Sequence, residues 1–388
     1  MAFLSFTGPR APRVLAAATS VIAVGAVSVG AVLADGYDAQ ELPRLETNIW
    51  VTRDDGQYAR LNTELGELDT VRAVADPVTV LQSGTQSVVL TQCLSQAWAI
   101  DSAFPADFVE QGSGQASGAA PAPTPAGTGV VATAHDFILY LTDSGEVHLG
   151  TFPAPGSVQS GAFAVNPFAG VEVEEGEEPP RYFASAAAID DSARVAMYSA
   201  AEKAVRVYDA LNARFIGAEV PLPQPPADAN EFVMSFAGGR WVLFSPTDGR
   251  LWWEGGSEPV DTGLGGEALL QTNPSPADRV FIADAQGLVA VSLRDGSVTR
   301  VVQATGNPAS PLWLNGEGYA AWVDAGSATM WYEGAPGVVN LTVPTGALAD
   351  VQVISPVFRS NGDRAVLSET STGLLWMVPD GTLIPLNQ

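Results

Sequence analysis

Lysine, histidine and cysteine are almost absent from this sequence of 388 residues. Lys203 is the only lysine, and 18 Lys and Arg stand against 43 Asp and Glu, which gives a net charge of -25. Nucleic acid binding needs clustered cations that neutralise phosphates, so no nucleic acid partner is expected. An acidic surface keeps a protein soluble. Binding of Ca²⁺ or of a basic partner is the alternative interpretation of the acidity.

The scarcity of Cys and His limits the chemistry that the chain can perform. Cys93 is the only cysteine, so neither an intrachain disulfide nor a multi-thiolate metal site can form, and we expect Cys93 to be buried in a strand. His135 and His148 are the only histidines, which gives little support to zinc catalysis or to a Ser-His-Asp triad. We expect both to pack or to face water. The sequence therefore predicts no catalytic, cofactor-binding or metal-binding residue, and no cofactor.

Charge is also missing from the run VLAAATSVIAVGAVSVGAVLA, residues 14–34, which is long enough as a helix to cross a bilayer. Arg10 and Arg13 precede it, so residues 1–13 are expected in the cytoplasm. The sequence thus predicts a single-pass membrane protein with an uncleaved signal anchor and a linker over residues 35–46. A signal peptide cleaved after Ala34, which would give a secreted protein, is the alternative.

The rest of the chain is rich in short apolar runs separated by turns, with 39 Gly and 28 Pro. In the stretch from Trp241 to Glu254, WVLFSPTDGRLWWE, two apolar runs flank a Thr-Asp-Gly turn, which predicts a β-hairpin. Neither run alternates apolar with polar residues. Both faces of these strands should therefore be covered by other sheets.

The same hairpin recurs along residues 47–388, and we count eight copies. Their first strands are expected within 49–51, 87–91, 137–141, 195–198, 241–245, 280–283, 319–323 and 365–367. The turn glycines Gly249, Gly287, Gly326 and Gly373 lie 38, 39 and 47 residues apart. Four-stranded propeller blades repeat with about this period.

This pattern predicts an all-β fold, a β-propeller of seven or eight four-stranded blades, because a closed ring covers both faces of every inner strand. Seven blades would result if the first strands completed the last blade. An array of β-sandwiches is the alternative, disfavoured because the region is too long for one sandwich. Tryptophans recur in the third strands, and we expect them to pack between blades and not to form a sugar platform. They are Trp98, Trp252, Trp331 and Trp376.

Two segments interrupt the repeat. Residues 112–129, GSGQASGAAPAPTPAGTG, contain no large apolar side chain and are predicted to form a disordered loop. Residues 171–180, VEVEEGEEPP, carry five glutamates. We expect a solvated acidic loop there, because the Asp-rich spacing of a calcium loop is missing.

The stretch from Asn48 to Val71, NIWVTRDDGQYARLNTELGELDTV, follows the predicted anchor directly. With that anchor and the repeat, it resembles the opening of large actinobacterial surface proteins that carry tandem fibronectin type III or Ig-like domains after a propeller-like region. The resemblance covers nearly the whole chain and supplies no catalytic residue. This chain stops at Gln388, before any such module, so we expect a fragment or a short member. The family's assignment to polysaccharide degradation rests on modules that this sequence lacks.

Two function classes follow from these observations. The first is a non-catalytic, membrane-anchored interaction or scaffold protein of the cell envelope, which binds a protein or a cell-wall glycan through the propeller. The second is a glycoside hydrolase, or its carbohydrate-binding accessory part. A hydrolase would require two carboxylates facing each other across a pocket. The sequence alone does not place any two of its acidic residues in that way.

Overall fold

The computed structural model describes residues 46–108, 120–153, 161–171, 180–226 and 231–385. Contacts divide the chain into residues 1–45 and a second unit, residues 46–388, and the account below concerns that second unit. The predicted cytoplasmic segment 1–13, the span 14–34 and nearly all of the linker 35–46 lie outside the described residues. Within the described residues, no helix is long and apolar enough to span a membrane.

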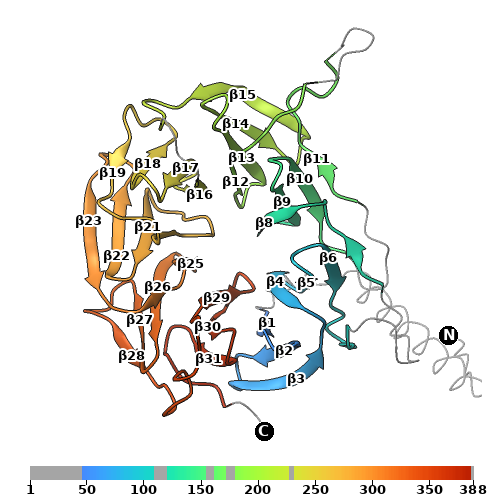
Figure 1. Ribbon diagram of the computed structural model, residues 1–388, viewed down its shortest axis with the longest axis vertical. Helices are drawn as coiled ribbons and strands as arrows, with labels where there is room; N and C mark the ends of the chain where they lie inside the picture. The colour runs from blue at the N-terminus through green and yellow to red at the C-terminus, as the bar shows by residue number, and fades with distance from the viewer. Residues whose placement is uncertain (1–45, 109–119, 154–160, 172–179, 227–230, 386–388) are drawn as a thin grey trace, which may run out of the picture. The chain divides into compact units, whose positions relative to one another are not determined.

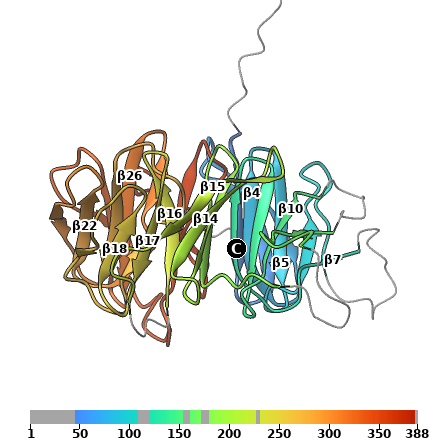
Figure 2. The same ribbon diagram turned by 90° about the horizontal axis from the view of Figure 1, so that it is seen from above.

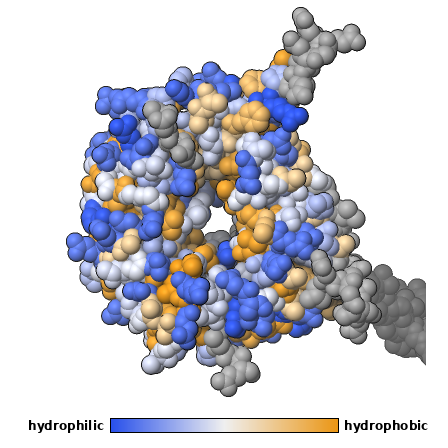
Figure 3. Space-filling model, viewed as in Figure 1, coloured by the Kyte–Doolittle hydropathy of each residue, from blue (hydrophilic) through white to orange (hydrophobic). Residues whose placement is uncertain are grey.

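The second unit is an all-β propeller in which eight sheets surround a central channel (Figure 1). Each sheet is called a blade and is numbered in chain order. Seen from the side, the blades stand next to one another with their strands running along the channel (Figure 2). The space-filling view shows the open mouth of the channel at the centre of the ring (Figure 3). Of the two blade counts that the sequence allowed, eight is confirmed.

Each blade is an antiparallel sheet made from one continuous stretch of chain. The strands of blades 1 to 4 are β1 (Asn48–Arg53), β2 (Gln57–Asn62) and β3 (Glu67–Ala73); β4 (Pro77–Ser83), β5 (Gln86–Thr91), β6 (Gln96–Ala99) and β7 (Ala122–Pro123); β8 (Thr128–Ala134), β9 (Phe137–Thr142), β10 (Val147–Thr151) and β11 (Phe163–Ala164); and β12 (Ala186–Ile189), β13 (Arg194–Ser199), β14 (Ala204–Asp209) and β15 (Arg214–Pro221).

The second half of the ring follows the same plan. Its strands are β16 (Val233–Ala237), β17 (Arg240–Ser245), β18 (Arg250–Trp253) and β19 (Val260–Asp261); β20 (Leu269–Leu270), β21 (Arg279–Asp284), β22 (Gly287–Ser292) and β23 (Val298–Gln303); β24 (Asn307–Pro308), β25 (Leu312–Leu314), β26 (Glu317–Asp324), β27 (Ser327–Tyr332) and β28 (Val339–Leu341); and β29 (Pro356–Ser360), β30 (Ala365–Glu369) and β31 (Leu374–Met377). In blade 7 two short strands, β24 and β25, both pair with β26.

The eight predicted hairpins are the two middle strands of the eight blades. The hairpin of β17 and β18, for example, pairs Leu243 with Trp252 and Phe244 with Leu251, and all four side chains are buried. Neighbouring blades cover both faces of such strands, which explains why their apolar runs do not alternate with polar residues. The prediction of two covered faces is therefore confirmed.

The third-strand tryptophans are core residues, as predicted. Trp376 and Trp252 have relative exposures of 0% and 1%, and Trp98 and Trp331 are also buried. The indole N–H of Trp252 donates a hydrogen bond to the carbonyl oxygen of Pro223 over 2.9 Å, and that of Trp376 donates to Thr342 over 2.8 Å. A buried indole thus keeps its polar atom satisfied, and these rings are not available as a sugar platform.

Blade 1 differs from the others because it lacks an innermost strand among the described residues. Its first strand, β1, pairs with β2 alone and is the counterpart of second strands such as β5 and β17. Figure 1 accordingly shows β1 farther from the channel than β4 and β29, which are the innermost strands on either side of it. A gap is therefore left in the inner wall between β29 and β4.

Two sequence predictions are corrected by the structure. The loop predicted over residues 112–129 extends too far, since Ala122–Pro123 forms β7 and β8 begins at Thr128. These short strands are held by pairing with β6 and β9, which local composition does not reveal. Cys93 is exposed and lies in the turn between β5 and β6, not in a strand. Residues 109–119 and the acidic residues 172–179 lie outside the described part of the chain.

Candidate functional site

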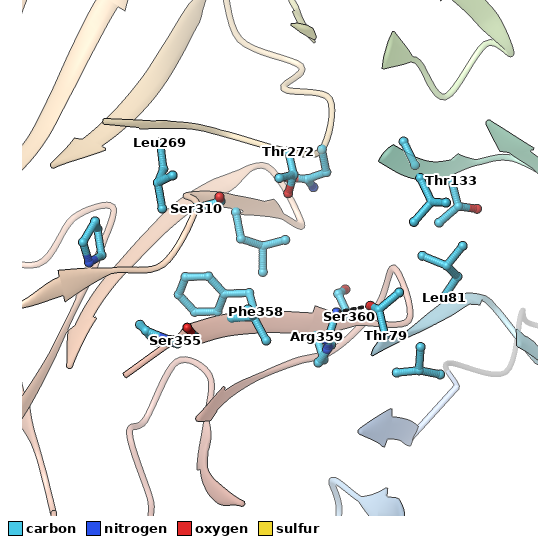
Figure 4. Close-up of a pocket in the computed structure, with 18 of the residues that line it drawn as sticks. Thr79, Leu81, Thr133, Leu269, Thr272, Ser310, Ser355, Phe358, Arg359 and Ser360 are labelled. Atoms are coloured by element: carbon cyan, nitrogen blue, oxygen red, sulfur yellow. Dashed lines mark hydrogen bonds between the residues drawn. The ribbon is translucent and has the colours of Figure 1, made fainter. Parts of the chain in front are cut away.

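A cavity of about 670 Å³ opens on the channel and is the candidate functional site. It is lined by the innermost strands, or by residues next to them, from blades 2, 3, 4, 6, 7 and 8. Figure 4 shows these side chains converging from several blades on one space. The labelled lining residues are Thr79, Leu81, Thr133, Leu269, Thr272, Ser310, Ser355, Phe358, Arg359 and Ser360.

The lining is mostly uncharged, and hydroxyl and amide groups alternate with apolar side chains. The innermost strands are less buried than the second strands, as a comparison of β4 or β29 with β5 or β30 shows. An innermost strand has one edge open to the channel, so polar side chains there keep their contact with water or with a ligand. The site is thus built for hydrogen bonding through neutral groups, with apolar contacts between them.

Two charged side chains line the cavity, Glu267 and Arg359. Glu267 is exposed, whereas Arg359 on β29 is partly buried. Nη1 of Arg359 donates a hydrogen bond to Oγ1 of Thr79 on β4 over 2.7 Å, and Figure 4 shows the two side chains meeting. Because β29 and β4 flank blade 1, this bond crosses the gap that the missing innermost strand leaves.

The guanidinium of Arg359 makes fewer hydrogen bonds and ion pairs than is usual for a partly buried guanidinium. Its Nε is buried and makes no hydrogen bond, and no carboxylate among the described residues lies within ion-pair distance. Burial lowers the pKa of Arg359 to about 10, and the charge of Asp54 opposes that shift. The side chain still stays protonated at neutral pH, since a pKa of about 10 is well above 7. Within the described part of the chain, the cavity wall therefore carries a positive charge that has no counterion at ion-pair distance.

The histidines that the sequence singled out are not part of this cavity. His135 lies in the turn between β8 and β9 with φ +54°, and its side chain is 43% exposed. His148 lies on β10, with Nε2 3.5 Å from Oε2 of Glu146. In the described part of the chain, no group of three or more His, Cys, Asp or Glu residues could hold a metal ion. The calcium alternative for residues 171–180 falls mainly outside the described residues.

Sequence reasoning missed Arg359 and Thr79. The segment PVFRS, residues 356–360, reads as an ordinary short strand, and PVTVLQS, residues 77–83, as another. The two functional side chains are separated by 280 residues and meet only because the ring closes. With eight blades in a ring, blades 8 and 2 lie on either side of blade 1. Nothing in the sequence, however, indicates that the described part of blade 1 has no innermost strand.

No family model matches this chain, and no curated protein sequence matches it. Solved structures do match. The computationally designed Ika8 protein aligns with a TM-score of 0.52 at 13% identity over 80% of this chain and 86% of that chain. Apo AztD from Citrobacter koseri aligns with a TM-score of 0.51 at 12% identity, over 87% of this chain and 93% of that one.

A streptogramin B lyase aligns with a TM-score of 0.50 at 8% identity, over 85% of this chain and 97% of that chain. At these identities the similarity shows the fold and nothing more. The matched proteins include both a lyase and a computationally designed protein, so the fold by itself allows catalytic and non-catalytic functions. The chain is an eight-bladed β-propeller that is similar to these proteins in architecture.

Proposed function

We propose that this protein is a non-catalytic binding or scaffold protein whose ligand enters the central cavity. One observation carries the proposal: side chains from six blades form a cavity of about 670 Å³, and most of its polar groups are uncharged hydroxyls and amides. Concave sites of this size with a few convergent polar groups are the usual places for ligands. Such a lining suits a ligand with many hydroxyl or amide groups, such as a cell-wall glycan or a segment of an envelope protein.

The cell envelope as the place of action belongs to the same proposal. It is supported by the apolar run of residues 14–34, by the two arginines that precede it, and by the resemblance of residues 48–71 to actinobacterial surface proteins. In this proposal the propeller lies outside the cytoplasmic membrane. The net charge of -25 is consistent with an envelope ligand and unfavourable for nucleic acid.

Glycoside hydrolysis is the second candidate, and the cavity gives it less support. A glycosidase of the usual kind places two carboxyl groups on either side of the bond that it cleaves. Glu267 is the single carboxylate in the described lining, and it is exposed. Glu267 thus lacks the buried surroundings in which a general acid of this kind usually lies.

Binding of purified cell envelopes tests the proposal. The detergent-solubilised full chain is incubated with intact envelopes, with protease-treated envelopes and with envelope protein alone, and bound chain is measured. We expect Ser310→Trp, which fills the cavity, to reduce binding at least tenfold. Thr299→Trp, on the exposed outer strand β23, is the matched control and should bind like the wild type. Equal binding by both variants, or release of reducing sugar ends by the wild type, would contradict the proposal.

A further inference from the structure

Among the described residues, side chains and not a β-strand span the gap between β29 and β4 beside blade 1. Seven of the eight blades contribute an innermost strand, and in blade 1 the described chain starts directly with the second-strand equivalent, β1. The side chain of Arg359 reaches from β29 to Thr79 on β4 over this gap. The guanidinium thus lies between β29 and β4 and lines the cavity (Figure 4).

Arg359 is partly buried, and no carboxylate of a described residue lies within ion-pair distance of it; the charge of Asp54 acts on it from farther away. Other arginines on the propeller, such as Arg194, Arg206 and Arg300, bind carboxylates at 3.3 Å or less. A charge removed from water without a partner is costly, and proteins rarely keep one there unless something pairs with it. The chain is short of cations, which makes the placement of one at this point more notable.

We propose that Arg359 and Thr79 form an oxyanion-binding site in the central cavity, which holds a carboxylate or phosphate group of the ligand. The proposal rests on the proposed function, since it assigns a chemical class to the ligand of the same cavity. It adds that the ligand is acidic: a glycan or peptide that carries negatively charged groups. The neutral hydroxyls and amides elsewhere in the lining then contact the uncharged remainder of the ligand.

The donors for an oxyanion are already in place. Nη1 of Arg359 donates to Thr79, and Nη2 makes no hydrogen bond to a described residue, whereas Nε is buried and out of reach of a ligand. The hydroxyl of Thr79 accepts from Arg359, so its own hydrogen is free to donate to a ligand. Hydrogen bonds between a guanidinium and an oxyanion are charge-assisted and about twice as strong as neutral ones. An oxyanion would also supply a direct counterion, which none of the described residues provides at ion-pair distance.

The overall negative charge of the protein does not prevent such binding. Charges farther apart than about 8 Å are largely screened at physiological ionic strength. Close to the site the nearest charges decide. Glu267, the other charged lining residue, is exposed and forms no ion pair with Arg359, and Asp54 acts on Arg359 from beyond ion-pair distance. We therefore expect the affinity for an acidic ligand to fall as the salt concentration rises.

The experiment titrates the detergent-solubilised full chain at constant ionic strength with inorganic phosphate and, separately, with glucuronate. Calorimetry and the melting temperature report binding. We expect a saturable response to at least one of the two probes, and the tighter probe identifies a phosphate or a carboxylate as the group recognised. Arg359→Gln should weaken that response at least tenfold, and Thr79→Val severalfold. Arg214→Gln, which removes a positive charge from the exposed outer strand β15, should leave it unchanged.

Arg359→Lys is included because it keeps the charge should Arg359→Gln fold poorly, and it should retain part of the binding. The proposal is overturned if neither probe gives a saturable response. It is also overturned if wild type and Arg359→Gln respond alike. In either case, Arg359 would have only a structural role between β29 and β4. Failure here is distinguishable from failure of the proposed function. Envelope binding that Ser310→Trp abolishes and Arg359→Gln leaves intact would overturn the oxyanion site alone.

Discussion

The backbone N–H of Trp50 donates a 3.1 Å hydrogen bond to Oε1 of Gln82, and Nε2 of Gln82 donates back to the carbonyl oxygen of Asn48 over 2.8 Å. Trp50 and Asn48 belong to β1, whose inner edge has no strand partner, and Gln82 belongs to β4 in the next blade. The side-chain amide therefore takes the place of a peptide group of the innermost strand that blade 1 lacks. Asn361 contributes similarly by donating to the carbonyl oxygens of Glu46 and Asn48.

Gln82→Leu should destabilise the propeller by about 1–3 kcal/mol, because it leaves the backbone N–H of Trp50 without a partner and removes one of the two hydrogen bonds to the carbonyl oxygen of Asn48. Chemical denaturation measures the free energy of unfolding. Gln303→Leu, at an exposed position on β23, is the control and should change it by no more than about 0.5 kcal/mol. Equal effects of the two substitutions would mean that the amide of Gln82 is not needed at the edge of β1.

Gly249 ends the central turn of the β17–β18 hairpin with φ +64°, and a Cβ atom there would meet the carbonyl oxygen of Leu264. Gly316 also has a positive φ, +82°, but a Cβ would meet nothing within 4 Å. Gly316→Ala should therefore cost about 1–2 kcal/mol from backbone strain alone. Gly249→Ala should cost about 1–3 kcal/mol more, because packed backbone must shift, and Gly249→Val should cost at least as much.

Thermal melting of these variants provides the measurement, with Gly266→Ala as a neutral reference. Gly266 has an ordinary φ and open space around it, so its substitution should stay within about 0.5 kcal/mol. If Gly249→Ala and Gly316→Ala lowered the melting temperature equally, the contact between the added Cβ atom at position 249 and the carbonyl oxygen of Leu264 would not destabilise the protein.

Burial raises the pKa of Tyr319 to about 12, and the hydrogen bond and charge of Glu317 add to this shift. An unfolded tyrosine loses its proton near pH 10. Between about pH 10 and 12 the unfolded chain has therefore lost a proton that the folded protein keeps, so stability falls over this range. Tyr319→Phe should remove this part of the loss. The stability difference between wild type and variant should be constant below pH 10 and shrink towards pH 12; a difference that stays constant would contradict the prediction.

The proposed topology predicts that protease added to intact spheroplasts digests the propeller. In that proposal, Arg10 and Arg13 keep the N-terminus in the cytoplasm and residues 14–34 cross the membrane. Immunoblotting of the remaining fragments provides the measurement, and a cytoplasmic protein is the control for membrane integrity. Protection of the propeller would contradict the topology. An N-terminus at Asp35, found by mass spectrometry, would replace the anchor by a cleaved signal peptide.

Most of the fold could be predicted from the sequence, because the middle strands of the blades carry a strong local signal. Apolar runs such as 241–245 and 280–283, each followed by a turn, identify the hairpins without knowledge of tertiary contacts. The innermost and outermost strands carry a weaker signal. The outer strand β7, Ala122–Pro123, sits inside a stretch of Ala, Pro and Gly and becomes a strand only by pairing with β6.

The candidate site could not be predicted, since it depends on which blades face each other across the gap.

Cys93 illustrates a related limit. The residues Gln92, Cys93 and Leu94 all have positive φ, a conformation that their types seldom adopt, and the β5–β6 turn is made by them without a glycine. The sequence therefore offered no glycine turn signal at Cys93.

Among the described residues, no β-ladder joins the first blade to the last. Each blade is made from its own stretch of chain, and across the seam between blades 8 and 1 there is no covalent connection within the ring. Packing of residues such as Ile49 and Val366, and hydrogen bonds such as that from Asp54 N–H to the carbonyl oxygen of Thr370, hold this seam. We therefore expect the ring, when it is pulled or heated, to open first between blades 8 and 1 while each blade keeps its own sheet.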